Sequence, residues 1–373
     1  MDSTVTTKPH RRQFRLQEGG LILVILFLGA LLTFFGGSVK TPKFNVNSDG
    51  TRERVFTTNA AGEKEPTFEE RNKFLNAQNL AQLAKDTSFI AIMAVGATLV
   101  IIAGGIDLSV GAIYALASVL AALVLNKFGA GGSWNHIVLG MLTCLGVASL
   151  CGLFNGAMIV SLGVHPFIIS LGTMAIFRGI AFVATKGQSV GDFPTDFREL
   201  VRYEVGNGLS LVPMLVMVIV AVIGGIYLSR TAPGRYIYAI GGNENATRYS
   251  GIGVRKVKLW VYIFSGFTAG IAALLSLGYY GAGTSGDGQG YELNVIAASV
   301  VGGASLSGGK GTALGALLGA LVIQMINSGI VILNIDQNYS QIIIGSVVII
   351  AVLLDQLNGW LAKRRLVKAV APA

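Results

Sequence analysis

The feature that most constrains this chain is a repeated series of long apolar stretches. A bilayer core about 30 Å thick needs roughly 20 apolar residues in helical form, and stretches near that length recur along most of the sequence. Only 13% of the residues are charged, whereas soluble domains average about 25%. The pattern predicts an all-α integral membrane protein with about ten transmembrane helices. The expected spans are 18–36, 88–104, 110–126, 137–161, 165–184, 209–228, 258–281, 291–304, 311–333 and 340–361.

Basic residues near the ends of the expected spans predict their orientation. The N-terminal tail, the segment after the sixth span and the C-terminus are rich in Lys and Arg, and ten spans place all three on one side. Because loops rich in Lys and Arg stay in the cytoplasm, we expect cytoplasmic N and C termini. The net charge of +9 then reflects topology and gives no support to nucleic-acid binding.

The spans and loops predict one transmembrane domain, 18–361, between cytoplasmic tails at 1–17 and 362–373. A basic stretch precedes the first apolar run, as in a signal peptide, but no A-x-A-like site follows, so we expect a retained span. An outer loop at 37–87 has mixed charge and is expected to be mostly flexible. Its end, 74–84, has helical apolar spacing, which fits a short helix at the membrane surface or a plain connector.

Glycine supplies 50 of the 373 residues, and several glycines stand four apart within the expected spans. Small residues at this spacing let helix backbones approach closely where lipid gives no hydrophobic drive for association. We therefore expect close packing at Gly152 and Gly156, at Gly266 and Gly270, and along Gly311, Gly315 and Gly319. The spans 88–104 and 291–304 are short and end at Gly-Gly, so either fits a broken helix.

The sequence contains no convincing catalytic, metal or nucleotide motif. The three His are scattered, and Cys144 and Cys151 share one apolar stretch, so neither a metal site nor a disulfide framework is expected. The G-x-G-x-x-G match at 281–286 follows a helix, and GASLSGGKGT at 303–312 misses the spacing of a phosphate-binding loop. We expect no cofactor in this chain, so any ATP must bind another subunit.

Four polar residues in or beside the spans are candidates for a substrate path: Asp107, Asn155, Arg178 and Asn294. Arg178 lies deep in the fifth span, where an Arg costs roughly 2.5–3.5 kcal/mol; it either lines the path as a donor or gate, or braces the bundle by bonding helix-end carbonyls. Asp107 either caps the following helix or binds substrate. The two amides either bond a hydroxylated solute or join helices.

The segment after the sixth span predicts a short cytoplasmic helix within a segment at 229–257. Asn243 suits an N-cap, Glu244 favours the positive helix end, and Gly251 suits a helix stop. The implied helix, 244–250, is about 10 Å long, which is shorter than the 12 to 15 residues or so that an isolated helix needs in water. It must dock against something, either a partner protein or the surface of the bundle.

Three segments together point to one family: GGIDLSVG at 104–111, GRYIYAIGGNENATRYSGI at 234–252 and YELNVIAASVVGGASLSGGKGTALGALLGAL at 291–321. From about Phe74 to Leu357, the chain resembles the inner-membrane permeases of ribose-type ATP-binding cassette (ABC) sugar importers. The resemblance implies a multi-pass transport subunit of the bacterial inner membrane, surrounded by lipid, and not an enzyme. It also implies three kinds of protein partner: cytoplasmic ATPase subunits, an extracytoplasmic solute-binding protein, and a second copy or sister permease.

In such importers a short cytoplasmic helix enters a groove on each ATPase. The resemblance assigns ATPase coupling here to Gly242, Asn243, Glu244, Ala246, Thr247, Arg248 and Gly251. The chain departs from the family at Asn294, where an acid is common, so no charge-based role is carried over to that position. Its outer loop at 37–73 is also longer than the family leads one to expect.

The leading hypothesis is a permease that imports a monosaccharide such as ribose, xylose or galactose. A second is a related permease for branched-chain amino acids, which would need fixed charges on the path; Arg178 and Asp107 are the only full charges expected near spans. A third is an ion-coupled carrier, which would need intramembrane acids; besides Asp107 the sequence predicts none. A membrane enzyme is the most remote hypothesis, because no span holds a cluster of His, Asp or Glu.

Overall fold

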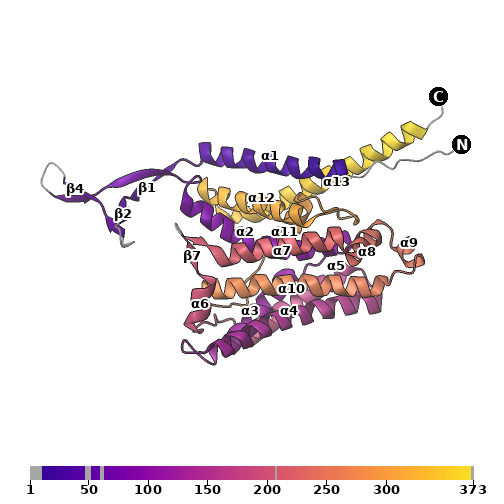
Figure 1. Ribbon diagram of the computed structural model, residues 1–373, viewed down its shortest axis with the longest axis horizontal. Coiled ribbons are helices and arrows are strands. Elements are labelled where there is room, and N and C mark those ends of the chain that lie inside the picture. Colours follow the sequence, from indigo (N-terminus) through magenta and orange to yellow (C-terminus); the bar gives the residue numbers. More distant parts are fainter. Residues whose placement is uncertain (1–10, 47–51, 59–62, 206–207, 371–373) are drawn as a thin grey trace.

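The computed structural model describes residues 11–46, 52–58, 63–205 and 208–370. Long helices lie side by side, with strands projecting from one end of the bundle and α9 at the other (Figure 1), so we call these the hairpin end and the α9 end. The helices are α1 (Arg11–Phe35), α2 (Ala77–Ile102), α3 (Val110–Asn126), α4 (Trp134–Leu162), α5 (Pro166–Thr185), α6 (Thr195–Val201), α7 (Leu211–Arg230), α8 (Ala232–Gly242), α9 (Glu244–Tyr249), α10 (Val254–Tyr280), α11 (Tyr291–Val301), α12 (Ala313–Ile332) and α13 (Ser340–Val370).

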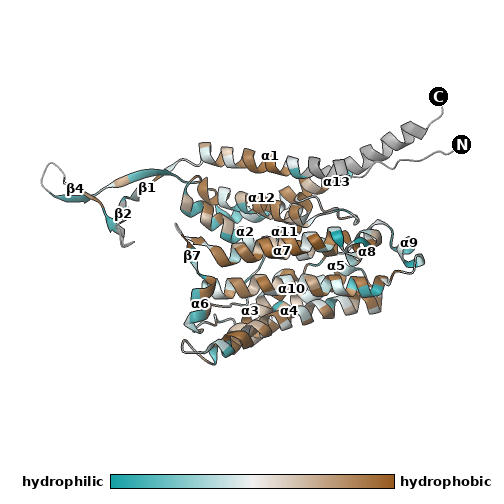
Figure 2. Ribbon diagram, in the orientation of Figure 1, coloured by the Kyte–Doolittle hydropathy of each residue, from teal (hydrophilic) through white to brown (hydrophobic). Residues whose placement is uncertain are grey.

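The helical membrane character expected from the sequence is confirmed. Among the described residues, seven helices are long and apolar enough to cross a bilayer: α1, α2, α4, α5, α7, α10 and α12. Three shorter apolar helices, α3, α11 and the segment Gln337–Leu353, occupy the remaining expected spans. The count of ten crossings stays a prediction. Figure 2 shows brown, apolar ribbon over the bundle and teal, polar ribbon over the strands and α9.

The core of the bundle is built around α2 and α10. In the most apolar window of α2, 94% of the residues are buried, and the corresponding share is 78% for α10 but only 22% for α7. The buried side chains of α2, α3 and α10 form one continuous apolar cluster. The central helices are therefore surrounded by protein, whereas α1, α4, α5 and α7 present apolar faces outward, as expected for helices in contact with lipid.

The expected flexible outer loop is largely paired into strands. β1 (Ser38–Pro42) pairs antiparallel with β6 (Phe68–Asn72), β2 (Phe44–Val46) with β3 (Arg52–Arg54), and β4 (Phe56–Thr58) with β5 (Lys64–Pro66). In the register of β1 and β6, Lys40 stands opposite Glu70, and an opposite-charge pair of this kind stabilises antiparallel strands. The mixed charge of the segment therefore does not prevent strand pairing. β7 (Glu204–Val205) and β8 (Leu209–Ser210) form a separate small hairpin, and η1 (Gln337–Tyr339) precedes α13.

The helix expected separately at 74–84 is the first part of α2. Asn76 caps α2 by accepting the Asn79 N–H at 2.8 Å. No Gly or Pro interrupts the next 19 residues or so, hence the helix continues into the bundle. Lys85, predicted to be in the outer loop, is only 2% exposed; its ammonium lies 3.1 Å from Asp86 and 4.2 Å from the centre of the Tyr279 ring.

The described parts of the expected tails are helical, since α1 begins at Arg11 and α13 ends at Val370. The rest of those tails, 1–10 and 371–373, lies outside the described residues. The first residues of α1 and the last of α13 lie at the α9 end (Figure 1). The shared side of the two chain ends agrees with the expected topology, and the assignment of that side to the cytoplasm stays a prediction.

The glycine ridges bring helix backbones into contact. A Cβ on Gly152 would clash with the Tyr262 carbonyl on α10, and one on Gly266 would clash with the Ala148 carbonyl on α4. Gly319 of α12 packs in the same way against the Ala298 carbonyl of α11. The close packing predicted at these glycines is therefore confirmed, with one correction: Gly311 lies in the loop that precedes α12 rather than on a helical ridge.

Two helices start inside the bundle. α2 is long rather than broken, but the chain leaves it at Ile102 and runs without helix through 103–109 before α3 begins. α11 has 11 residues, about 16 Å at 1.5 Å per residue, and follows the non-helical segment 281–290. A Cβ on Gly111 would clash with the Gly288 carbonyl and approach the Glu292 carboxylate. The beginnings of α3 and α11 thus meet, and we call this contact the helix-start junction.

Candidate functional site

The short helix predicted after the sixth span is present as α9, Glu244–Tyr249, one residue shorter than expected. Asn243 is its N-cap and accepts the Ala246 N–H at 2.9 Å, because an Asn side chain satisfies a donor that the first helical turn leaves free. Gly251 follows with a φ of +82°, a conformation that glycine adopts without strain. The predicted cap and stop are therefore confirmed.

α9 is attached to the bundle on one side and exposed on the other. Thr247 is buried, and its hydroxyl donates to the Asn243 carbonyl at 2.8 Å. The Lys258 ammonium on α10 donates to Glu244 at 2.7 Å, and Arg248 pairs with the same carboxylate at 3.0 Å. The remaining predicted coupling residues are exposed: Gly242, Asn243, Ala246, Arg248 and Gly251. The bundle therefore covers only part of this helix.

Glu244 has a pKa below its ordinary value. The hydrogen bond from Lys258 is the largest cause, and the positive charges of Lys258 and Arg248 add to it, while partial burial acts in the opposite direction. The carboxylate form is therefore the one that holds α9 to α10.

Asp107 and Asn155 share one buried hydrogen-bond network near the start of α3. The Asp107 carboxylate accepts the Ser109 N–H at 3.0 Å, the Ser109 hydroxyl at 2.6 Å and the Ser265 hydroxyl at 3.0 Å. Asn155 donates to the Ser109 hydroxyl at 2.7 Å. Asp107 thus bonds the residue that precedes α3 rather than the first helical N–H groups, and it joins α3, α4 and α10. Its expected capping role is corrected to that extent.

Arg178 braces the segment that leads to α11. From the middle of α5, its guanidinium donates to the Ser285 carbonyl at 2.8 Å and to the Asp287 carbonyl. Asp287 in turn closes a turn by accepting the Thr284 N–H at 2.9 Å. Of the two alternatives for Arg178, the structure shows bonding to backbone carbonyls, although the carbonyls belong to a loop and not to a helix end.

Asn294 lies apart from the Asp107 network and is half-buried rather than buried. Within the described residues its side chain makes no hydrogen bond. The structure therefore brings Asp107 and Asn155 together but not all four path candidates.

Sequence reasoning missed Glu292, which stands in the first turn of α11. Its Oε2 atom is buried without a hydrogen-bond partner in the described structure. The residue lies at the very edge of the span expected at 291–304, which is why it was not counted among intramembrane acids. Ser109 and Ser265 were also missed, since no spacing signal distinguishes them from other serines.

In the described part of the chain, no group of three or more His, Cys, Asp or Glu is placed to hold a metal ion. Cys144 and Cys151 are free thiols buried along α4, as their common apolar stretch predicted. The geometry consists of helix packing, a buried polar network and an exposed short helix. Such an arrangement suits conformational change and binding.

Known proteins resemble the chain over most of its length. The ribose import permease of Escherichia coli strain K12 is 38% identical over 284 residues, which cover 76% of this chain and 87% of the relative. The D-allose transport system permease of the same strain is 37% identical over 285 residues, 76% of this chain and 85% of the relative. The fructose import permease of Rhizobium meliloti is 31% identical over 297 residues, 78% of this chain and 80% of the relative. No solved structure matches the chain.

The matched region covers the helical bundle from α2 to α13 and leaves out α1. A family model described as "Branched-chain amino acid transport system / permease component" matches residues 79–352, which begin within α2 and end within α13. The strand arm at 38–72 lies outside that range. The helix-start junction, the Asp107 network and α9 all lie inside it. The chain therefore belongs to this family of transport-system permease components.

Proposed function

We propose that this chain is the membrane-spanning permease subunit of an ATP-driven ABC importer that brings a monosaccharide into the cytoplasm. The observation that carries the proposal is the 38% identity to a ribose import permease across 87% of that protein. The allose and fructose relatives extend the substrate class to related monosaccharides. Although the family description names branched-chain amino acids, these relatives are all named for sugars, which favours the sugar hypothesis.

The proposed topology places the α9 end in the cytoplasm and the hairpin end outside the bacterial inner (plasma) membrane. The apolar helices fit a multi-pass protein, and the basic segments at both termini and around α9 favour this orientation. Ten crossings bring all three basic segments to the same side. The single permease domain then spans 18–361, with the strand arm outside and the 229–257 segment in the cytoplasm.

The proposed partners follow from the lack of any ATP-binding motif in the sequence and from the exposed face of α9. Two cytoplasmic ATPase subunits bind α9 through Gly242, Asn243, Glu244, Ala246, Thr247, Arg248 and Gly251. A second copy or sister permease completes the path through the membrane, and an extracytoplasmic solute-binding protein delivers sugar at the hairpin end. The chain itself is a transport subunit, and ATP hydrolysis belongs to its partner.

In the proposed mechanism, ATP binding and hydrolysis bias the bundle between an outward-open and an inward-open state. The bias enters at α9, whose exposed surface is available to the ATPase. Asp107, Asn155 and Arg178 hold the walls of the path, since the Asp107 carboxylate, the Asn155 amide nitrogen and the Arg178 guanidinium bond protein atoms. Asn294, whose amide is free, is the proposed donor and acceptor for sugar hydroxyls.

Reconstitution tests the function. The chain is placed in proteoliposomes alone, or together with its ATPase and solute-binding protein, and uptake of tritiated ribose is measured with ribose, allose, xylose, galactose, fructose or leucine as unlabelled competitor. We expect accumulation only with the ATPase and ATP, and competition by a monosaccharide but not by leucine. Accumulation driven by a proton or sodium gradient without ATPase would establish an ion-coupled carrier instead, and competition by leucine alone would favour amino-acid transport.

A charge reversal on α9 tests the coupling residues. Glu244→Lys removes the bond to Lys258 and places a positive charge at the positive end of the helix. We expect ATPase co-purification and ATP-driven uptake to fall, whereas Glu204→Lys at the opposite end should leave ATPase co-purification unchanged. If Glu244→Lys co-purified with the ATPase and took up ribose as the wild type does, the proposed role of α9 in coupling would be wrong.

A further inference from the structure

α8, the helix before α9, ends against two other parts of the chain with almost no side chain between them. A Cβ on Gly241 would clash with the Ile102 carbonyl and with the Gly309 amide nitrogen, and one on Gly308 would lie 2.8 Å from the Gly241 carbonyl oxygen. The Gly309 N–H also donates to the Ile102 carbonyl at 2.8 Å. Three backbone segments therefore meet at Gly241, and we call this contact the glycine joint.

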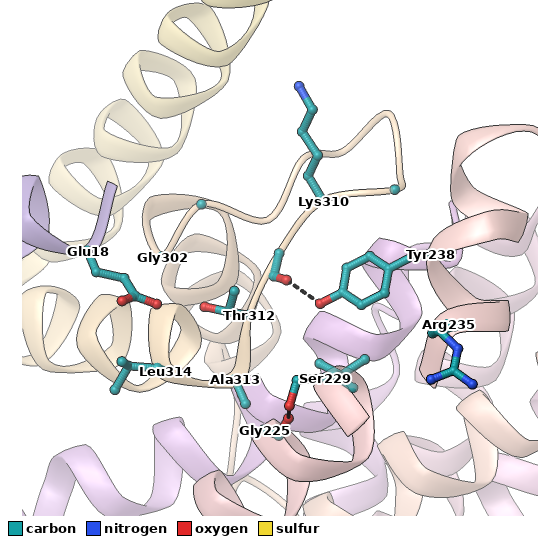
Figure 3. Close-up of a pocket in the computed structure, with 14 residues that line it drawn as sticks. Glu18, Gly225, Ser229, Arg235, Tyr238, Gly302, Lys310, Thr312, Ala313 and Leu314 are labelled. Atoms are coloured by element: carbon teal, nitrogen blue, oxygen red, sulfur yellow. Dashed lines mark hydrogen bonds between the residues drawn. The ribbon is translucent and has the colours of Figure 1, made fainter. Parts of the chain in front are cut away.

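A tyrosine adds a second attachment between α8 and the same loop. The Tyr238 hydroxyl donates to the Gly311 carbonyl at 2.7 Å, as the dashed line in Figure 3 shows. The two residues line a cavity of about 650 Å³ between α7, α8, the loop at 302–312 and the start of α12. This hydrogen bond therefore adds to the backbone contacts that hold the loop at Gly308 and Gly309.

The glycine joint connects to both sides of the helix-start junction. Ile102 is the last residue of α2, and seven residues separate it from Val110, where α3 begins, with Asp107 among them. The loop at 302–312 connects α11 to α12, and these two helices are held together where Gly302 meets Gly315 and Ala298 meets Gly319. α11 in turn begins at the junction.

α9 is connected to the glycine joint by a short path, because only Asn243 separates it from α8. We propose that the glycine joint transmits displacement of α9 to the starts of α3 and α11, with Gly241 and Tyr238 as positioning residues for energy coupling. The inference rests on the proposed function, since it assumes that an ATPase moves α9. Because close-packed atoms transmit strain, we expect movement of α8 to displace the end of α2 and the 302–312 loop with it.

A competing route runs through Lys258 to α10. That route is an ion pair whose side chains are 22% and 38% exposed, and exposed pairs are weak and screened by salt. The backbone contacts at Gly241 do not depend on charge. Coupling through the joint is therefore expected to persist at high ionic strength, whereas coupling through Lys258 would weaken.

The mild test replaces Tyr238 by Phe in the full complex of permease, ATPase and binding protein in proteoliposomes. We expect tritiated ribose accumulated per ATP hydrolysed to fall by about 2- to 10-fold, which is the effect of one hydrogen bond, with unchanged ATPase co-purification. Tyr227→Phe is the matched control, because Tyr227 lies nearby on α7 and packs through its ring against Phe264. It should keep the wild-type ratio.

The stronger test replaces Gly241 by Ala, which separates the three segments. We expect transport per ATP to be lost while ATPase activity continues, whereas Gly225→Ala on α7, where the added Cβ meets only Ala313 at 4.0 Å, should transport normally. Thermal unfolding of each variant in detergent shows whether the fold is kept. If Gly241→Ala does not fold, the amount of ribose accumulated per ATP hydrolysed by Tyr238→Phe alone tests the glycine joint.

The outcomes separate the two proposals. Ribose accumulation by the wild type without ATPase would refute the proposed function and the glycine joint with it. ATP-driven uptake in the wild type together with an unchanged transport-to-ATP ratio in Tyr238→Phe would overturn the joint alone. The glycine joint would also be overturned if Lys258→Gln lost coupling while Tyr238→Phe kept the wild-type amount of ribose accumulated per ATP hydrolysed. Displacement of α9 would then travel through α10.

Discussion

Asp107 shows how a charge is accommodated inside an apolar bundle. The carboxylate is 2% exposed and would be costly to bury alone, but three donors satisfy it and the beginning of α3 lies beside it. Its direct partners are Ser109 before α3 and Ser265 on α10, and Ser109 in turn accepts a hydrogen bond from Asn155 on α4. The side chain therefore fixes the relative positions of α3, α4 and α10 more than it serves any one helix.

Replacing Asp107 by Asn tests this role. The neutral amide offers one acceptor oxygen in place of two, so Ser109 or Ser265 loses a partner, and the free energy of unfolding should fall by about 1–3 kcal/mol. Unfolding in mixed detergent micelles measures the change, with Ser265→Ala expected to cost less. The KM for ribose uptake by the folded Asp107→Asn variant should equal that of the wild type. If the KM rose while the free energy of unfolding stayed the same, Asp107 would instead bind substrate.

At the residue scale, the sequence predicts the role of a side chain when its partner is close to it in the chain. Asn243 could be identified as a cap because the capping bond joins residues three apart. The partners of Asp107 could not be identified, because Ser265 is 158 residues away in the chain. Glu292 has a visible charge, but its importance depends on α11 starting inside the bundle, which no local pattern shows.

At the scale of elements, glycines decide which helices touch. Gly152 and Gly266 let the backbones of α4 and α10 meet, and the spacing of four residues predicted close contact from the sequence. The partner of each ridge was not predictable, since a ridge shows that a helix packs closely without showing against what. The strand arm was missed for a related reason: each strand is short and stabilised only by its partner.

A pair of alanine substitutions tests the ridge. Gly266→Ala places a methyl group against the Ala148 carbonyl, so the helices must separate, and we expect a loss of about 1–3 kcal/mol in the free energy of unfolding. Gly146→Ala on α4 meets open space and should be neutral or stabilising by up to about 1 kcal/mol. Equal stability of the two variants in micelle unfolding would contradict the packing.

The attachment of α9 should depend on pH. Because the pKa of Glu244 is lowered in the folded protein, its bond to Lys258 is fully present above the ordinary carboxyl pKa and is lost as pH falls through the lowered value. A spin label at Tyr249→Cys, which is 90% exposed, should gain mobility in acid. With Glu244→Gln the label should be mobile at every pH; a retained transition would assign the pH dependence to another group.

At the scale of the molecule, the membrane bundle and the strand arm are two structurally distinct parts. The arm contributes no helix to the bundle, exposes Phe56 and Phe68, and lies outside the family match at 79–352. Composition predicted the membrane class because long apolar stretches admit few other structures. It could not predict which helices are central, because α2 and α7 are both apolar yet are buried to very different extents.

Deleting residues 43–67 and joining Pro42 to Phe68 by a short Gly-Ser turn tests this separation. β1 and β6 remain paired at the base of the arm, so we expect the Tm of the bundle to change by no more than about 2 °C, because the deletion exposes little apolar surface. Differential scanning fluorimetry in detergent gives the comparison. A marked fall in Tm would mean that the arm packs on the bundle.

The helix-start junction bears on the kind of solute that passes. The N-terminus of a helix carries roughly half a positive charge. In carriers with broken helices, such N-termini attract the anionic group of the substrate. Here each beginning has a resident carboxylate, Asp107 beside α3 and Glu292 in the first turn of α11. An incoming amino acid would find those electrostatic positions already taken, whereas an uncharged polyol competes for none of them.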